Sequence, residues 1–219
     1  MGKLIVLEGL DGSGKATQTA LLYSYLMEKG TPCKRITFPN YAEDTSALVK
    51  MYLSGELGGL DEVGGYGASL FYTVDRYGSY LRNWKQDYLS DCVILSDRYT
   101  TSNVAHQMGK LPREEWDDYL QWLCDLEYKR VGLPAPTRVI YLDMHPETSR
   151  RLLSRRYDGD ETKKDIHEAN LAYLLQCREA ALYGAQQQGW KVISCCNGSE
   201  PYPQEQIFQA IIEALSDIL

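Results

Sequence analysis

The stretch EGLDGSGKATQ, residues 8–18, constrains the fold of this chain more than any other feature. An apolar segment, residues 3–8, precedes it, and a helical pattern, residues 15–29, follows from Lys15. Glycines let backbone N–H groups converge on phosphate oxygens, and the start of a helix adds its positive dipole end. The order of strand, loop and helix therefore predicts a nucleotide-phosphate site. Its candidate ATP-binding residues are Gly9, Leu10, Asp11, Gly12, Ser13, Gly14, Lys15, Ala16 and Thr17.

The residue after Lys15 departs from the usual pattern, which has Ser or Thr there as a Mg²⁺ ligand. This chain has Ala16, and Thr17 lies about 100° further round the helix. Mg²⁺ commonly keeps several waters, so a water can fill the vacated position, with Asp11 and Asp97 orienting such waters. The alternative is a chain that binds nucleotides without catalysis.

Five short apolar segments are typical of parallel strands that are covered on both faces. They are residues 3–8, 33–38, 92–97, 138–143 and 190–194. Helical patterns lie between and after them, including residues 112–130 and a one-sided apolar stripe from 207 to 219. Strand and helix in alternation predict a layered α/β fold. The glycine-rich residues 55–67 are expected to form a loop.

Composition limits the classes of partner. The chain has 219 residues and a net charge of −7, which argues against nucleic acid, whose binding proteins present a basic face. No apolar run approaches the length of a membrane span, and the start lacks the layout of a signal peptide. We therefore expect a cytoplasmic protein without membrane attachment. Its six cysteines form no C-x-x-C pair and are expected to be free thiols.

Polar residues follow the third predicted strand, in SDRYTTSNVAHQ at residues 96–107. Ligands of open α/β sheets bind at the carboxyl ends of the strands. We therefore expect Asp97 to face metal-bound water and Arg98 to contact a phosphate. The most charged stretch is RRYDGDETKKD at residues 155–165, and its charge alone favours a solvated loop.

Taken together, these segments resemble the thymidylate kinases, which are P-loop nucleoside monophosphate kinases. The matching segments are, in order, EGLDGSGK, FPNY (38–41), SLFYTVDR (69–76), DRYTTSNVAHQ (97–107), EYKRVGLPAP (127–136) and YLDMHPE (141–147). The resemblance implies an α/β fold of three layers, the P-loop fold, with a five-stranded parallel sheet wrapped by helices. It implies one kinase domain over residues 1–219, a short mobile lid at approximately 150–166, and a homodimer.

The activity implied by the resemblance is transfer of the ATP γ-phosphoryl group to dTMP, giving ADP and dTDP for dTTP supply, with Mg²⁺ as cofactor. Two alternatives stay open: a kinase for another nucleoside monophosphate, and a non-catalytic nucleotide-binding regulator. The implied substrate-binding residues are Asp11, Phe38, Pro39, Tyr41, Phe71, Tyr72, Arg76, Arg98, Asn103 and His106. Among them Arg76 hydrogen-bonds the thymine ring, and either Tyr72 or Phe71 stacks on it.

The chain departs from the family pattern at three positions. Ala16 is one, and Asn40 is another, because relatives often carry an arginine there that contacts the acceptor phosphate. Gly12 is the third: some members carry an arginine at that place in the loop, and members without it use basic lid residues instead. The candidate catalytic residues are therefore Lys15, Arg98, Arg155 and Arg156, and the candidate metal-site residues are Asp11 and Asp97.

Overall fold

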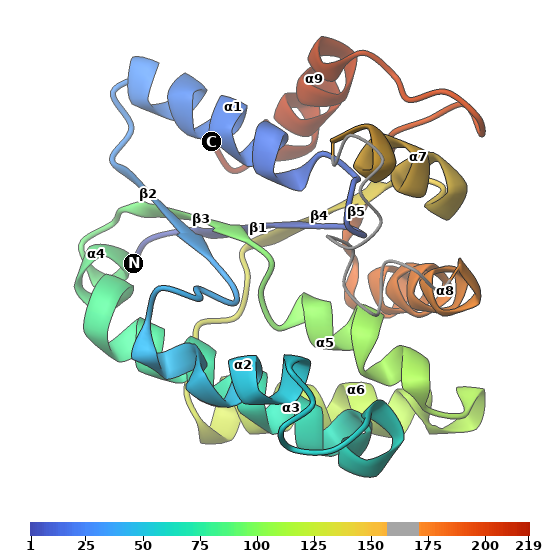
Figure 1. Cartoon of the computed structure of the whole chain (residues 1–219). Coiled ribbons are helices and arrows are strands. Elements are labelled where there is room, and N and C mark those ends of the chain that lie inside the picture. The colour runs from blue at the N-terminus through green and yellow to red at the C-terminus, as the bar shows by residue number, and fades with distance from the viewer. Residues whose placement is uncertain (157–170) are drawn as a thin grey trace.

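A parallel sheet forms the centre of the protein, whose computed structural model describes residues 1–156 and 171–219. All five of its strands run parallel, in the order β2-β3-β1-β4-β5 (Figure 1). The strands are β1 (Leu4–Glu8), β2 (Cys33–Thr37), β3 (Val93–Asp97), β4 (Arg138–Asp143) and β5 (Lys191–Ser194). Each falls within a predicted apolar segment, so the prediction of a parallel five-stranded α/β sheet is confirmed.

Helices cover both faces of this sheet. They are α1 (Lys15–Glu28), α2 (Ala47–Leu53), α3 (Leu60–Ser79), α4 (Lys85–Leu89), α5 (Thr101–His106), α6 (Trp116–Cys124), α7 (Pro146–Arg156), α8 (Leu171–Gln188) and α9 (Gln204–Leu215). Helices α1 and α9 lie on one face, and α3, α5, α6 and α8 lie on the other (Figure 1). Within the described ranges, no helix combines the length and the apolar character needed to cross a bilayer.

Alternate residues of the strands supply two separate cores, because successive side chains of a strand point to opposite faces. Ile5 and Leu7 of β1 belong to the core beneath α1 and α9. Leu4 and Val6 belong to the core on the opposite face, which also contains Trp84. The four β1 residues have no exposed surface. Burial on both faces explains why the strands read as unbroken apolar runs.

The glycine-rich segment differs from its prediction. A loop was expected over residues 55–67, but α3 begins at Leu60, with non-helical backbone only at Gly64, where φ is 65°. A Cβ atom on Gly65 would lie 2.8 Å from the backbone oxygen of Gln107. The glycine there permits close packing of α3 against the segment after α5, and the loop expectation is wrong for residues 60–67.

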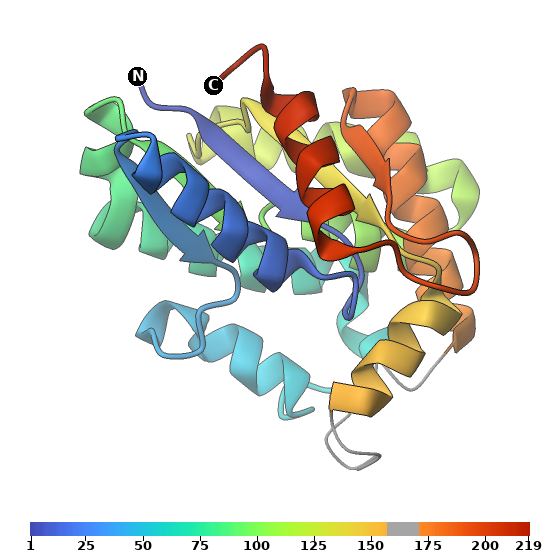
Figure 2. The ribbon, with the colours of Figure 1, turned by 90° about the horizontal axis from the view of Figure 1, so that it is seen from above.

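The carboxyl ends of β1 and β3 lie side by side, since Leu7 pairs with Asp97 in the parallel register. The loop that follows β1 therefore lies beside Asp97 and Arg98. Helix α7 lies near this same edge of the sheet, close to the loop between β1 and α1 (Figure 2). The topology thus gathers three segments that are distant in sequence around one site.

Candidate active site

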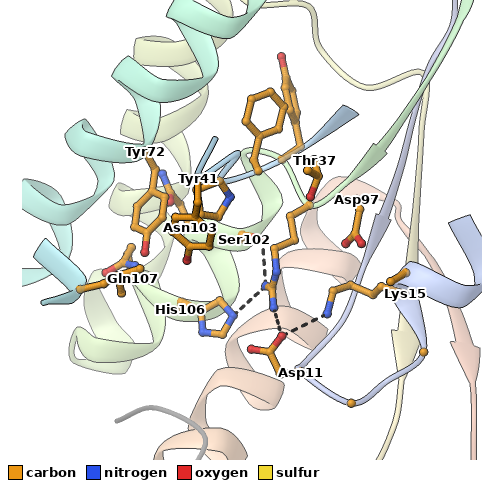
Figure 3. Close-up of a pocket in the computed structure, with 18 of the residues that line it drawn as sticks. Asp11, Lys15, Thr37, Tyr41, Tyr72, Asp97, Ser102, Asn103, His106 and Gln107 are labelled. Atoms are coloured by element: carbon orange, nitrogen blue, oxygen red, sulfur yellow. Dashed lines mark hydrogen bonds and ion pairs between the residues drawn. The ribbon is translucent and has the colours of Figure 1, made fainter. Parts of the chain in front are cut away.

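One cavity of about 470 Å³ lies at this edge of the sheet. It brings together most of the predicted site: Asp11, Gly12, Gly14, Lys15, Ala16, Thr17, Phe38, Pro39, Tyr41, Tyr72, Arg76, Asp97, Arg98, Asn103 and His106. Lys15, Asp97 and Asp11 lie at one end, and Tyr72, Asn103 and Gln107 lie at the other (Figure 3). The cavity therefore has an end with a cation and two carboxylates and an end with aromatic and amide side chains.

Four predicted residues do not line this cavity, namely Gly9, Leu10, Ser13 and Phe71. Gly9, Leu10 and Ser13 are buried within the loop. Phe71 packs its ring 6.0 Å from that of Tyr52, so of the two candidate stacking rings it is Tyr72 that lines the cavity. Arg155 and Arg156 are the last residues of α7, and residues 157–166 of the expected lid lie outside the described residues.

Lys15 is folded back onto the loop that carries it. Its Nζ atom donates to the backbone oxygens of Gly9 at 2.7 Å and Leu10 at 3.0 Å, and lies 3.8 Å from Asp11 Oδ1. Burial and the neighbouring Arg98 lower the pKa of Lys15. An anionic group in the cavity would offset both effects, so the loop offers a preformed cation to a phosphate.

Gly12 lies directly against α7. Its φ is +81°, and a Cβ atom there would come 2.7 Å from the backbone oxygen of Ser149 and 3.0 Å from Leu153 Cγ. The side chains of Leu152 and Leu153 line the cavity, so α7 forms part of its wall. A loop arginine at position 12 has no room in this arrangement, which agrees with the departure from the family pattern at that position.

Arg98 connects the two ends of the cavity. Its Nη2 atom donates to Asp11 Oδ1 at 2.5 Å, its Nη1 atom lies 3.6 Å from Glu8 Oε1, and Nη1 also lies 3.2 Å from His106 Nε2 (Figure 3). Burial opposes its charge, but Asp11 and Glu8 raise the pKa of Arg98 above its ordinary value. Its backbone has φ of 67°, a conformation that is uncommon outside glycine and that clusters at functional sites.

Glu8 is a buried counter-charge to Arg98. It was not among the predicted site residues. It has no exposed surface and accepts hydrogen bonds from Thr101 Oγ1 at 2.8 Å, Ser102 Oγ at 2.7 Å and the Gly9 backbone N–H at 3.0 Å. The sequence signal was a charged residue that ends an otherwise apolar buried strand. Its partners 93 and 94 residues away give no local signal.

Arg76 reaches the cavity wall through a buried ion pair with Glu127, another residue that the sequence reading did not assign. Arg76 Nε donates to Glu127 Oε2 at 2.9 Å, and Nη2 donates to Oε1. Thr73 Oγ1 and Thr100 Oγ1 donate to the same carboxylate at 2.8 and 2.6 Å. Since Arg76 is 1% exposed and Glu127 is 0% exposed, each charge depends on the other.

Asn103 has an unused hydrogen-bond donor at the aromatic end of the cavity. It is 1% exposed, and its Nδ2 atom has no hydrogen-bond partner among the described residues. A buried amide N–H without a partner is costly, and such groups in native proteins usually await a ligand or water. Tyr72 offers an aromatic surface beside it (Figure 3).

Asp97 is the carboxylate that best fits a Mg²⁺ ion bound together with phosphates. Its side chain lines the cavity next to Lys15, and burial raises its pKa while Lys15 and Arg98 lower it. A cation there would favour the ionised carboxylate. Asp11 has its Oδ1 atom engaged by Arg98, and Arg98 and Lys15 overcome the effect of burial to hold its pKa below the ordinary value. Ala16 and Thr17 both line the cavity, which leaves space for water where the usual hydroxyl would lie.

Comparisons with known proteins agree on one family. The family model described as thymidylate kinase matches residues 7–206. The thymidylate kinase of Arabidopsis thaliana is 28% identical over 99% of this chain and 73% of its own length. That of Mycobacterium tuberculosis is 30% identical over 85% of this chain and 87% of its own. The structure of thymidylate kinase from Candida albicans matches with a TM-score of 0.73 at 21% identity, covering 99% of this chain and 92% of that one, and shows the same fold.

Proposed function

The chain belongs to the thymidylate kinase family and is an ATP-dependent enzyme that phosphorylates dTMP, and we propose that it does so in the cavity at the carboxyl ends of β1 and β3. The observation that carries this proposal is the polarity of that cavity. Lys15 and Asp11 lie toward one end, where Asp11 pairs with Arg98, and Tyr72 and Asn103 lie toward the other (Figure 3). A nucleoside monophosphate likewise has a charged phosphate group at one end and an aromatic base at the other.

The proposed roles follow from position. The loop 9–17 and Lys15 hold the β- and γ-phosphates of ATP, as backbone N–H groups and a lysine do in such loops. Arg98 holds the acceptor phosphate, with Tyr41, Phe38 and Pro39 on the same side. Phosphoryl transfer depends chiefly on holding the reacting groups in line and on stabilising charge, and these cations do both.

The proposed base and sugar contacts use the other end of the cavity. Tyr72 stacks on the thymine ring, Arg76 and Asn103 hydrogen-bond its edge, and His106 lies beside the sugar. Support comes from the cavity lining and from the unpartnered Asn103 Nδ2 atom. Asp11 orients Arg98 and lies near the sugar 3′-OH.

Mg²⁺ is the proposed cofactor, held by Asp97 and Asp11 through water and by the phosphates themselves. When bound, the ion neutralises charge on the transferring phosphoryl group. Ala16 leaves one position to water. Protein side chains supply the rest of the positive charge. Lys15 contacts phosphate oxygens of ATP, and Arg98 holds the acceptor phosphate close to the γ-phosphate.

The proposed lid, residues 150–166 of a single kinase domain over 1–219, supplies Arg155 and Arg156 to the transition state. The support is that α7 ends at these residues and that its Leu152 and Leu153 line the cavity. The double variant Arg155→Ala/Arg156→Ala should lower kcat by about 10³-fold or more, as removal of an arginine finger does. Its affinity for ATP, measured by equilibrium binding, should stay nearly intact. A loss of only about twofold in kcat would contradict the role.

A homodimer is the proposed assembly. Helix α3 and the π-helix that continues it (Tyr80–Trp84) expose an apolar stripe at helical spacing: Tyr66, Leu70, Val74, Tyr77 and Leu81 are 37–51% exposed. A contiguous apolar stripe of this kind is typical of an interface between subunits. Net charge of −7 and free thiols at all six cysteines suit a cytoplasmic enzyme that does not bind nucleic acid.

Val74→Glu should convert the dimer to a monomer, because it places a charge at the centre of the stripe, where Val74 is 51% exposed in the single chain. Light scattering coupled to gel filtration measures the mass. The matched control is Val192→Glu, at a 46% exposed valine on β5, which should leave the mass unchanged. A monomeric wild type, or a dimeric Val74→Glu variant, would refute the assignment of this surface.

The direct test of the function is a coupled ADP-release assay over a panel of nucleoside monophosphates. The proposed function predicts that dTMP has the highest kcat/KM of the panel. A higher value for CMP or AMP would assign the chain to another acceptor. Binding of ATP without turnover of any acceptor would make it a non-catalytic regulator.

A further inference from the structure

We propose that Asp75 is a positioning residue for the acceptor: it anchors residues 38–46 against α3, and this anchor holds Pro39 and Tyr41 at the wall of the cavity. The proposal rests on the dTMP kinase function described above and deepens it. Asp75 is not among the described residues that line the cavity, so it acts through the anchored segment and contacts no substrate itself.

Residues 38–46 connect the end of β2 to the start of α2, which lies beside α3 (Figure 1). Phe38, Pro39 and Tyr41 of this segment line the cavity. Its first residue is fixed on the sheet, because the backbone N–H of Phe38 donates to the carbonyl oxygen of Asp97 at 3.1 Å. Beyond Phe38 the segment leaves the sheet, so the positions of Pro39 and Tyr41 depend on contacts further along it.

Asn40, one of the departures from the family pattern, helps to fold this segment. Its Oδ1 atom accepts the backbone N–H of Ala42 at 3.2 Å, and its carbonyl oxygen accepts the N–H of Glu43 at 3.0 Å. Ser46 Oγ donates in turn to the carbonyl oxygen of Glu43 at 2.9 Å. These local bonds fold residues 40–46 into compact turns, which need a contact with another element to fix them relative to the cavity.

Asp75 of α3 supplies that contact. It is 1% exposed, and its Oδ1 atom accepts the hydroxyl of Thr45 at 2.8 Å. Burial raises the pKa of the Asp75 carboxyl above its ordinary value, and three neighbours act against this shift: the Thr45 hydroxyl, the Arg76 guanidinium and the Asn40 backbone N–H. These neighbours favour the ionised carboxylate, which accepts stronger hydrogen bonds than a neutral group does. One buried carboxylate thus lies near both ends of the compact turns.

The packing of α3 suits this anchor. A Cβ atom on Gly78, almost one turn after Asp75, would lie 2.6 Å from Thr45 Cγ2. The glycine therefore lets the Thr45 methyl group lie against the helix while the hydroxyl reaches Asp75. Lys50 of α2 also donates to the Tyr41 carbonyl oxygen at 3.2 Å, but that bond is exposed to water. The bond between Asp75 and Thr45 is partly buried, so it constrains the segment more strongly.

Thr45→Val tests the anchor with a change of nearly equal volume. It removes the hydroxyl but keeps the branched side chain that packs on Gly78. The free enzyme should then hold the segment in place for a smaller fraction of the time, which lowers the apparent affinity for the acceptor by that fraction. KM for dTMP should rise about tenfold, while KM for ATP and kcat change by less than about threefold.

Thr45→Ser keeps the hydroxyl and should restore KM for dTMP to within about threefold of wild type. The matched control is Thr31→Val, at a half-buried threonine that lies before β2, at the opposite end of that strand from residues 38–46. It should change none of the three constants. A KM for dTMP as high in Thr45→Ser as in Thr45→Val would contradict the role of the hydroxyl.

Asp75→Ala, alone and combined with Thr45→Val, shows whether the two residues act through one bond. Each single variant should raise KM for dTMP, and the double variant should exceed the larger single effect by less than about threefold. Single effects that multiply in the double variant would overturn the proposal. A purely structural carboxylate would lower Tm but leave KM for dTMP at the wild-type value in the folded variants, and that result would also overturn it.

Thr45→Val decides the question by itself if Asp75→Ala does not fold, because a folded Thr45→Val variant with the wild-type KM for dTMP refutes the anchor. If wild type turns over dTMP but Thr45→Val behaves like Thr31→Val, only this inference fails. If wild type does not turn over dTMP, the proposed function itself fails.

Discussion

Arg98→Lys should lower kcat/KM for dTMP by about 10²–10³-fold in a protein that remains folded. The lysine keeps a cation near Asp11 and Glu8, so those two carboxylates stay compensated. It cannot reproduce the guanidinium fork, which donates to Asp11 at 2.5 Å and approaches His106 at 3.2 Å while presenting N–H groups to the cavity. A planar guanidinium group can donate two parallel hydrogen bonds to one phosphate, and an ammonium group cannot.

Steady-state kinetics with varied dTMP at saturating Mg·ATP measure the effect of Arg98→Lys. Arg130→Lys is the matched control, because Arg130 is 74% exposed and pairs with Asp125 on the surface. The control should stay within about twofold of wild type. If Arg98→Lys retains more than about a tenth of the wild-type kcat/KM, Arg98 is a structural cation and does not hold the acceptor phosphate.

Glu127→Gln should lower the free energy of unfolding by about 3 kcal/mol, which corresponds to a fall in Tm of about 6–12 °C. Glu127 is 0% exposed, and the substitution leaves the Arg76 guanidinium buried without a counter-charge. Thr73 and Thr100 also lose part of the acceptor that they share with Arg76. Urea denaturation gives the free energy of unfolding, and differential scanning calorimetry gives Tm.

The double variant Arg76→Met/Glu127→Met separates stability from binding. It removes both charges, and replacement of a buried pair by apolar residues is often neutral or stabilising. Its stability should therefore exceed that of Glu127→Gln, while KM for dTMP stays raised because Arg76 no longer reaches the cavity. A double variant with normal KM for dTMP would make Arg76 a purely structural residue.

Local sequence patterns predicted the strands and the phosphate loop because those features depend on neighbouring residues. The predicted strand at residues 138–143 matches β4 residue for residue, because its four central residues are apolar and buried, as in a parallel strand covered on both faces. The predicted helix over residues 112–130 divides into a 3₁₀ turn (Arg113–Glu115), α6 and a π-helix (Asp125–Arg130). The periodicity of apolar residues does not distinguish between these closely related helices.

Residues whose roles depend on distant partners escaped the sequence reading. Glu127 pairs with Arg76 across 51 residues, and Glu8 receives its hydrogen bonds from α5. The local sequence around Glu127 does not distinguish a buried carboxylate from an exposed one, and that around Glu8 shows only a charged residue at the end of an apolar strand. Gly65 escaped for the opposite reason: glycine usually signals a turn, but here it allows a helix to pack closely on the backbone of Gln107.

Phosphoryl transfer by the natural loop, with Ala16 in place, is the central claim, and ³¹P NMR of wild type with Mg·ATP and dTMP tests it most directly. The spectrum should show dTDP and ADP growing in equal amounts. Ala16→Ser, measured beside it at saturating substrates, should differ from wild type by no more than about tenfold in rate, equivalent to 1.4 kcal/mol in barrier. If wild type binds both nucleotides but forms no dTDP, while Ala16→Ser does, the natural chain is a nucleotide binder that has lost catalysis.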